Sequence, residues 1–95
     1  MTKEEFEKIG EALKEAQKIG MGADFSLHRQ ADDYTITLRS RKNDKTLHIV
    51  AKGDIFVSTV TTGKKTDNLY QSIMDRIGPL IAMEKAAIER EAENE

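Results

Sequence analysis

The chain has 95 residues, a formal net charge of −2 and no cysteine. This length suits one domain with one modest hydrophobic core, and the lack of cysteine excludes disulfides, thiolate catalysis and cysteine-ligated zinc. No apolar run approaches the ~18 residues of a membrane-spanning helix, and the charged N-terminal segment does not resemble a signal peptide. We therefore expect a cytoplasmic protein.

The first predicted element is an amphipathic helix that begins after Thr2. Thr2 and Glu5 have the spacing of a capping box, in which each side chain accepts a hydrogen bond from the other residue's backbone N–H. The glycines at positions 20 and 22 predict the end of the helix. Apolar residues recur between these limits at helical spacing, which predicts one buried face; they are Phe6, Ile9, Leu13, Ala16 and Ile19.

From Asp24 onward, apolar and polar residues alternate, as is typical of β-strands with one buried face. Short polar or glycine-containing segments divide this region into four alternating runs. The pattern predicts a four-stranded antiparallel meander. Its strands are expected at residues 24–30, 34–41, 45–52 and 55–62.

The turns of this meander set its predicted register. A two-residue turn at Asn43-Asp44 pairs Leu38 with Ile49, and one at Gly53-Asp54 pairs Ala51 with Phe56. In this register the apolar residues collect on one face of the sheet, which predicts the side that the helices cover. They are Phe25, Leu27, Tyr34, Ile36, Leu38, Leu47, Ile49, Phe56 and Val60.

A C-terminal helix is predicted next, with Thr66 as its N-terminal cap. Leu69, Ile73 and Ile77 have the spacing of a buried helical face. Gly78-Pro79 is expected to break or kink this helix, because proline lacks the backbone donor and crowds the preceding turn. Residues 90–95 form an acidic tail that we expect to fray. The whole chain, residues 1–95, is thus predicted to be a single α+β domain with its helices on one face of the sheet.

The predicted fourth strand poses a problem, because residues 55–63 carry no charge and the strand lies at the edge of the meander. Exposed edge strands are usually protected by lysine, proline or a bulge. We therefore expect this strand to be covered, either by a second copy of the chain or by the C-terminal helix. The residues assigned to a self-association surface are Val50, Ile55, Val57 and Thr59.

The two histidines do not form a metal site in the predicted sheet. His28 and His48 lie two strands apart and four residues out of step, which corresponds to roughly 16 Å. His48 falls in a row with Asp24 and Arg39 across the strands, for which a cross-strand ion pair is the simpler interpretation. We identify no catalytic set, and we predict no metal, no cofactor and no enzymatic activity.

Basic residues supply an alternative, which is phosphate or nucleic-acid binding. Residues 21–66 carry eight basic and five acidic groups, a charge of +3. Lys64 and Lys65 precede a predicted helix N-terminus, where anions are favoured, but a phosphate-binding loop requires glycine at the position of Ser58. Arg39 and Arg41 lie on the rim of a sheet whose outer face has no aromatic residue for base stacking. The residues assigned to ligand or phosphate contacts are Arg39, Arg41, His48, Lys64 and Lys65.

These features favour a small, non-enzymatic protein-binding or regulatory module that forms a homodimer or a higher homo-oligomer. Nucleic-acid binding through the basic rim is the first alternative, and binding of a nucleotide or small anion is the second. The size and composition suit an accessory protein of a bacterium or phage. The partner itself is not specified by any motif in the chain.

Overall fold

The computed structural model describes residues 2–28, 33–52, 55–58 and 69–93. The elements occur in the predicted order, with one helix before the strands and one after them. They are α1 (Lys3–Lys18), β1 (Gly22–His28), β2 (Asp33–Ser40), β3 (Lys45–Lys52), β4 (Ile55–Ser58) and α2 (Leu69–Glu93). The strands form one antiparallel sheet in the order β1-β2-β3-β4, so the α+β architecture and the meander are confirmed.

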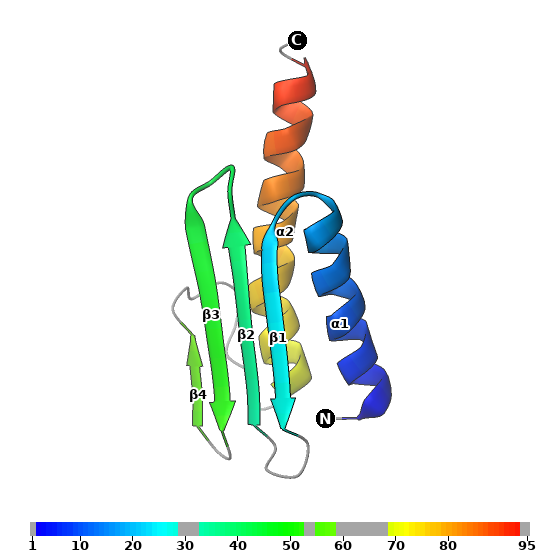
Figure 1. Ribbon diagram of the computed structural model, residues 1–95, viewed down its shortest axis with the longest axis vertical. Helices are drawn as coiled ribbons and strands as arrows, with labels where there is room; N and C mark the ends of the chain where they lie inside the picture. The colour runs from blue at the N-terminus through cyan, green and yellow to red at the C-terminus, as the bar shows by residue number, and fades with distance from the viewer. Residues whose placement is uncertain (1, 29–32, 53–54, 59–68, 94–95) are drawn as a thin grey trace.

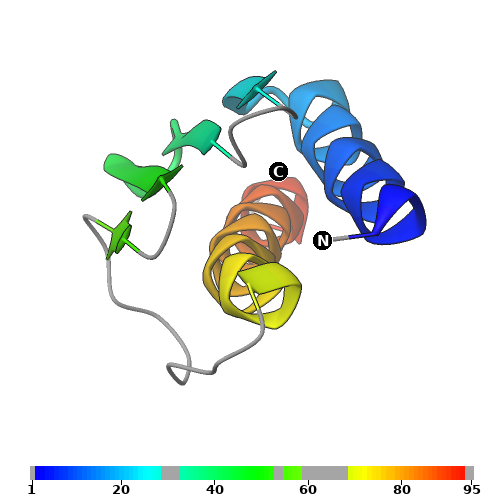
Figure 2. The ribbon, with the colours of Figure 1, turned by 90° about the horizontal axis from the view of Figure 1, so that it is seen from below.

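Both helices lie on the same face of the sheet (Figures 1 and 2). Helix α1 packs against β1, and α2 packs against β2, β3 and α1. Seen along the strands in Figure 2, α2 occupies the concave side of the twisted sheet while α1 lies beyond β1. Neither of the two described helices therefore covers the convex face of the sheet.

Helix α1 starts and ends as the sequence predicts. The capping box is complete, since Glu5 N donates to Thr2 Oγ1 (3.1 Å) and Thr2 N donates to Glu5 Oε1 (3.0 Å). At the other end Gly20 has a φ of 93°, a left-handed conformation that favours glycine. This turn lets Met21 N donate to Ala16 O (3.0 Å), which satisfies one of the last carbonyls of the helix.

The hydrophobic core lies between the helices and the concave face of the sheet. Phe25 is half-buried and stacks on Phe6 at a ring-centroid distance of 4.8 Å. The predicted core residues Leu27, Phe56 and Val60 lie outside the described side chains. The buried apolar residues belong to α1, to the segment after α1, and to β2, β3 and α2. They are Ile9, Leu13, Ala16, Met21, Tyr34, Ile36, Leu38, Leu47, Ile49, Ala51, Ile73, Ile77, Leu80 and Ile81.

The register of β2 differs from the prediction by two residues. Leu38 pairs with Leu47 instead of Ile49, because residues 41–44 all lie in the turn and Asp44 takes a left-handed φ of 49°. A shift of two residues keeps every side chain on its predicted face. The assignment of the core face is therefore correct even though the two-residue turn was wrong. Between β3 and β4 the predicted pairing of Ala51 with Phe56 is confirmed.

Helix α2 continues through the predicted interruption. It runs from Leu69 to Glu93 with Pro79 inside it, so Gly78-Pro79 does not break it into two helices. Proline costs a helix about 3 kcal/mol and leaves the carbonyl four residues earlier without its helical donor. Burial of Ile77, Leu80 and Ile81 around Pro79 offsets this cost, since each buried aliphatic side chain contributes about 1.5–3 kcal/mol. The predicted cap Thr66 lies outside the described residues.

Candidate functional site

An apolar pair lies on the convex face of the sheet, at its β4 end. Val50 in β3 pairs directly with Val57 in β4, and both side chains point away from the helices. Val57 is 54% exposed and is the one large exposed apolar side chain among the residues whose burial is described. Val50 is half-buried. We call Val50 and Val57 the valine pair.

No described helix covers the valine pair. The predicted alternative was that the C-terminal helix packs over the β4 edge, but α2 packs against β2 and β3 on the opposite face (Figure 2). Two further residues were assigned to this surface. The backbone of Ile55 pairs with Lys52 at the start of β4, and Thr59 lies outside the described residues.

A polar row crosses the same convex face, with a membership that differs from the prediction. The observed pairing places Asp24, Thr37 and His48 side by side on β1, β2 and β3. Thr37 Oγ1 and His48 Nδ1 share a hydrogen bond of 2.9 Å. Arg39, which was expected beside His48, pairs instead with Gly22 and Thr46. The predicted Asp24–Arg39–His48 row is therefore wrong, because β2 is shifted by two residues.

The described structure places three of the five predicted phosphate-binding residues, which are Arg39, Arg41 and His48. Arg39 lies on β2 and Arg41 in the turn that follows, and both side chains are exposed. The neighbouring Lys42 Nζ is 2.7 Å from Glu91 Oε2 at the end of α2, and the hydrogen bond with this carboxylate raises the pKa of Lys42. A carboxylate thus lies beside one of the cations of this turn. Lys64 and Lys65 lie outside the described residues.

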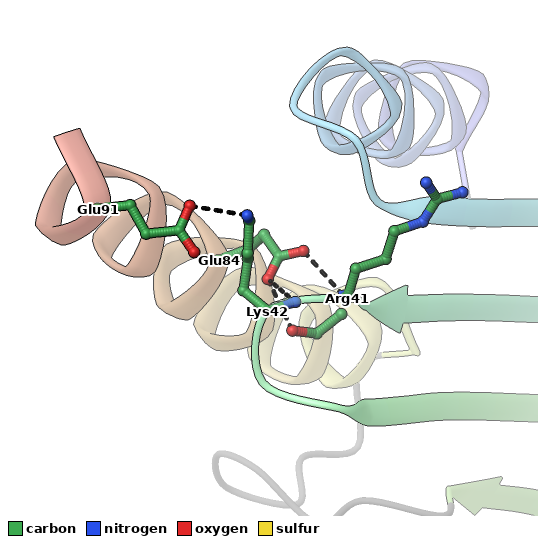
Figure 3. Close-up of polar contacts among 5 residues, drawn as sticks. Arg41, Lys42, Glu84 and Glu91 are labelled. Carbon is green, nitrogen blue, oxygen red and sulfur yellow. Dashed lines mark hydrogen bonds and ion pairs between the residues drawn. The ribbon is translucent and has the colours of Figure 1, made fainter. Parts of the chain in front are cut away.

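A buried polar cluster that was not predicted connects α2 to the turn between β2 and β3 (Figure 3). Glu84 is 1% exposed, and Ser40 is fully buried. Glu84 Oε1 accepts hydrogen bonds from Ser40 Oγ (2.8 Å) and Lys42 N (3.1 Å), and Glu84 Oε2 accepts one from Arg41 N (3.0 Å). Ser40 Oγ in turn accepts from Asn43 N (3.1 Å). We call this set the Glu84 clasp.

The electrostatics of the Glu84 clasp favour the ionised carboxylate. Burial by itself raises the pKa of Glu84, but the hydrogen bonds from Ser40, Arg41 and Lys42 outweigh it and hold the pKa below its usual value. Figure 3 shows the Arg41 guanidinium directed away from this carboxylate, so the contact from Arg41 is made by its backbone. The arrangement satisfies turn amides, and it leaves no carboxylate oxygen of Glu84 without a hydrogen bond.

One sequence signal could have revealed the clasp. Glu84 continues the buried face of α2 at helical spacing from Ile77 and Ile81. A carboxylate in such a position is rarely buried unless it is paired or hydrogen-bonded. Its partners could not be identified from the sequence, because Ser40 lies 44 residues away along the chain.

A shallow groove runs between α1 and the open edge of β1. Its floor and walls combine apolar and polar side chains, and Gln17 Nε2 donates a hydrogen bond to the Ala23 carbonyl across it (2.8 Å). The residues that line this groove are Gly10, Leu13, Lys14, Gln17, Ala23, Asp24 and Phe25.

The chain matches no protein-family model, no curated protein and no solved structure. Within the described ranges, no group of three or more His, Asp or Glu side chains is placed to hold a metal ion. None of the described helices is both long enough and apolar enough to cross a membrane. The geometry and chemistry of its surfaces are therefore the features of this protein that bear on its function.

Proposed function

We propose that the protein is a non-enzymatic protein-binding module that self-associates through the convex face of β3 and β4. The observation that supports this most strongly is the exposure of Val57, which pairs with Val50 and lies on the last described strand of the sheet. Homo-oligomers with two-fold symmetry use one self-complementary patch on both copies. A valine pair on a strand that has no second neighbour among the described strands suits either apposition of two convex faces or pairing of two β4 edges.

The energy available from this surface is moderate. Burial of an aliphatic side chain contributes about 1.5–3 kcal/mol, and association costs several kcal/mol in translational and rotational entropy. The valine pair from both copies supplies four such side chains. Because Val57 is 54% exposed and Val50 is half-buried before association, each gains only part of this amount, and we expect a weak dimer whose population depends on protein concentration, as suits a regulatory module.

Replacement of Val57 with lysine tests this proposal. The lysine would place a charge at the centre of the surface, while the fold should persist because Val57 is already 54% exposed. We expect light scattering to give twice the monomer mass for the wild type and the monomer mass for Val57→Lys. Ala86→Lys is the matched control, because Ala86 is exposed on α2 and far from the convex face. A wild-type monomer at high micromolar concentration, or a dimeric Val57→Lys protein, would contradict the proposal.

Phosphate or nucleic-acid binding through the basic rim has less support. Arg39 and Arg41 are exposed, but the neighbouring Lys42 pairs with Glu91, and the clasp places a second carboxylate against the same turn. No Phe, Tyr or Trp lies among the described side chains of the convex face. His48 is the one described aromatic ring there, which is less than the several rings of a base-stacking surface.

A further inference from the structure

The open edge of β1 has the features of a peptide-binding site. β1 pairs with β2 on one side, and none of the described strands lies on its other side. Such an edge presents unpaired N–H and C=O groups that an additional strand can bind. Helix α1 lies along this edge, so an added strand would lie in the groove that Gly10, Gln17 and Ala23 help to line.

The contact between Gln17 and Ala23 shows which backbone groups face the groove. The Ala23 carbonyl accepts a hydrogen bond from the Gln17 side-chain amide (2.8 Å), as it would from the backbone N–H of a neighbouring strand. The N–H and C=O of one residue point to the same side of a strand, and this side alternates along the chain. The N–H and C=O of both Ala23 and Phe25 therefore face the open edge.

The helical wall of the groove is low at Gly10. A Cβ atom added there would meet no atom within 4 Å, so the space above this residue is open. Leu13 and Phe25 supply apolar surface on the two sides of the groove. This combination suits a main chain flanked by small apolar side chains, because bulky side chains would compete with α1 for the same space.

Two charged residues line the groove, Lys14 on α1 and Asp24 on β1, and Asp24 is the one that lies in the sheet beside an added strand. Asp24 is exposed on the convex face, and it forms no ion pair with any described residue. On an added strand, the residue opposite Asp24 would point to the same face, where a basic side chain pairs favourably with the carboxylate. Its two neighbours would point toward α1 and the apolar part of the groove.

We propose that the groove between α1 and β1 binds an extended peptide of a partner protein, with a lysine or arginine between two small apolar residues. The peptide adds a fifth strand to the sheet at β1, and its backbone N–H replaces the Gln17 side chain on the Ala23 carbonyl. This site lies at the opposite edge of the sheet from the valine pair. A result that contradicts one of the two proposals therefore leaves the other unaffected.

Nuclear magnetic resonance titration of the ¹⁵N-labelled full chain with a defined peptide tests this inference. The probe is the capped heptapeptide Ser-Thr-Val-Lys-Val-Thr-Ser. We expect saturable shifts of the backbone amides of Ala23 and Phe25 and of the Gln17 side-chain amide, with a Kd of about 1 mM or tighter. The same peptide with its two valine nitrogens methylated lacks those donors and should bind about tenfold more weakly.

Charge exchange and groove filling provide the controls. A peptide with glutamate in place of its lysine should bind the wild type about two- to fivefold more weakly, and Asp24→Lys should reverse this preference. Gly10→Leu should abolish the shifts by filling the groove, whereas Gly10→Ala should preserve them. Leucine and alanine both have a higher helix propensity than glycine, so neither variant should weaken α1. Val57→Lys should bind the peptide as the wild type does.

Three results would overturn the inference. The first is an absence of saturable shifts at Ala23, Phe25 and Gln17. The second is equal binding by the Gly10→Leu and Gly10→Ala variants. The third is a shift of these signals with protein concentration when no peptide is present, since a second copy of the chain would then occupy the edge.

Discussion

Removal of the Glu84 carboxylate should destabilise the protein by an amount that the geometry of the clasp sets. Glu84 Oε1 accepts hydrogen bonds from Ser40 Oγ and Lys42 N, and Glu84 Oε2 accepts one from Arg41 N. A hydrogen bond to a charged group contributes about 1.5–3 kcal/mol. The desolvation of a buried carboxylate opposes this contribution, and water can reach the turn amides once the side chain is removed.

We therefore expect Glu84→Ala to lower the free energy of unfolding by about 2–4 kcal/mol. Glu84→Gln should cost less, about 1–2 kcal/mol, because an amide oxygen at the Oε1 position keeps two of the three bonds. The amide nitrogen would then face the Arg41 N–H. Because both groups are donors, this third hydrogen bond would be lost. Glu89→Gln on the exposed face of α2 is the control, with an expected change below about 0.5 kcal/mol.

Urea denaturation followed by circular dichroism measures these differences, and hydrogen exchange locates them. The Arg41 and Lys42 amides should exchange faster in Glu84→Ala than in the wild type, because both amides donate to this carboxylate. A Glu84→Gln variant as stable as the wild type would refute the stabilising role of the carboxylate. So would exchange rates at Arg41 and Lys42 that the alanine variant does not change.

The same carboxylate makes stability depend on pH in a defined direction. The pKa of Glu84 in the folded protein lies below its usual value of 4.5, so the unfolded chain binds the proton more tightly. Its contribution is fully present above the unfolded pKa and is lost as the pH falls through the folded pKa. The stability difference between wild type and Glu84→Gln should therefore be constant above about pH 5.5 and shrink as the pH falls below 4.5.

Two further single substitutions and one triple variant test other parts of the structure. Leu38→Ala should cost about 2–5 kcal/mol in urea denaturation, because Leu38 is fully buried beneath the helices, and a near-neutral result would mean that the faces of the sheet are reversed. Gly10→Ala should raise the free energy of unfolding by up to about 1 kcal/mol, since glycine weakens a helix interior and the added Cβ meets no atom; a loss of stability would contradict the open groove. We expect no nanomolar binding to DNA or RNA near physiological salt in filter-binding assays. If such binding is found, the combined change of Arg39, Arg41 and Lys45 to glutamine should reduce its log–log salt slope by about two to three, and the basic rim would replace the valine pair as the main functional surface.

Most of the architecture could be predicted because local signals agreed with one another. The capping box at Thr2 and Glu5 begins α1, and Gly20 ends it in the left-handed conformation that the sequence indicates. The two-residue periodicity assigned Ile36 and Leu38 to the core face. This assignment tolerated the error in register, because a slip of two residues leaves the faces unchanged.

The errors arose where distant residues determine the local conformation. The turn after β2 contains four residues, and Glu84 binds its amides from a helix more than 40 residues away in the sequence. Gly78-Pro79 predicted a break or a kink from local chemistry alone, and the break does not occur because burial of Ile77 and Ile81 keeps α2 continuous. Val57 was placed correctly on the convex face, since β4 keeps the predicted register with β3.

The most direct test of the proposed self-association is a dilution series of the ¹⁵N-labelled wild type, monitored by amide chemical shifts. We predict that the amides of Val50 and Val57 shift as the concentration rises from about 10 µM to about 1 mM, and that Val57→Lys removes this dependence. The amides of α1 and β1 should remain constant over the same range. Shifts confined to β1, or none at Val50 and Val57, would contradict the assignment of the convex face of β3 and β4 as the surface through which the protein self-associates.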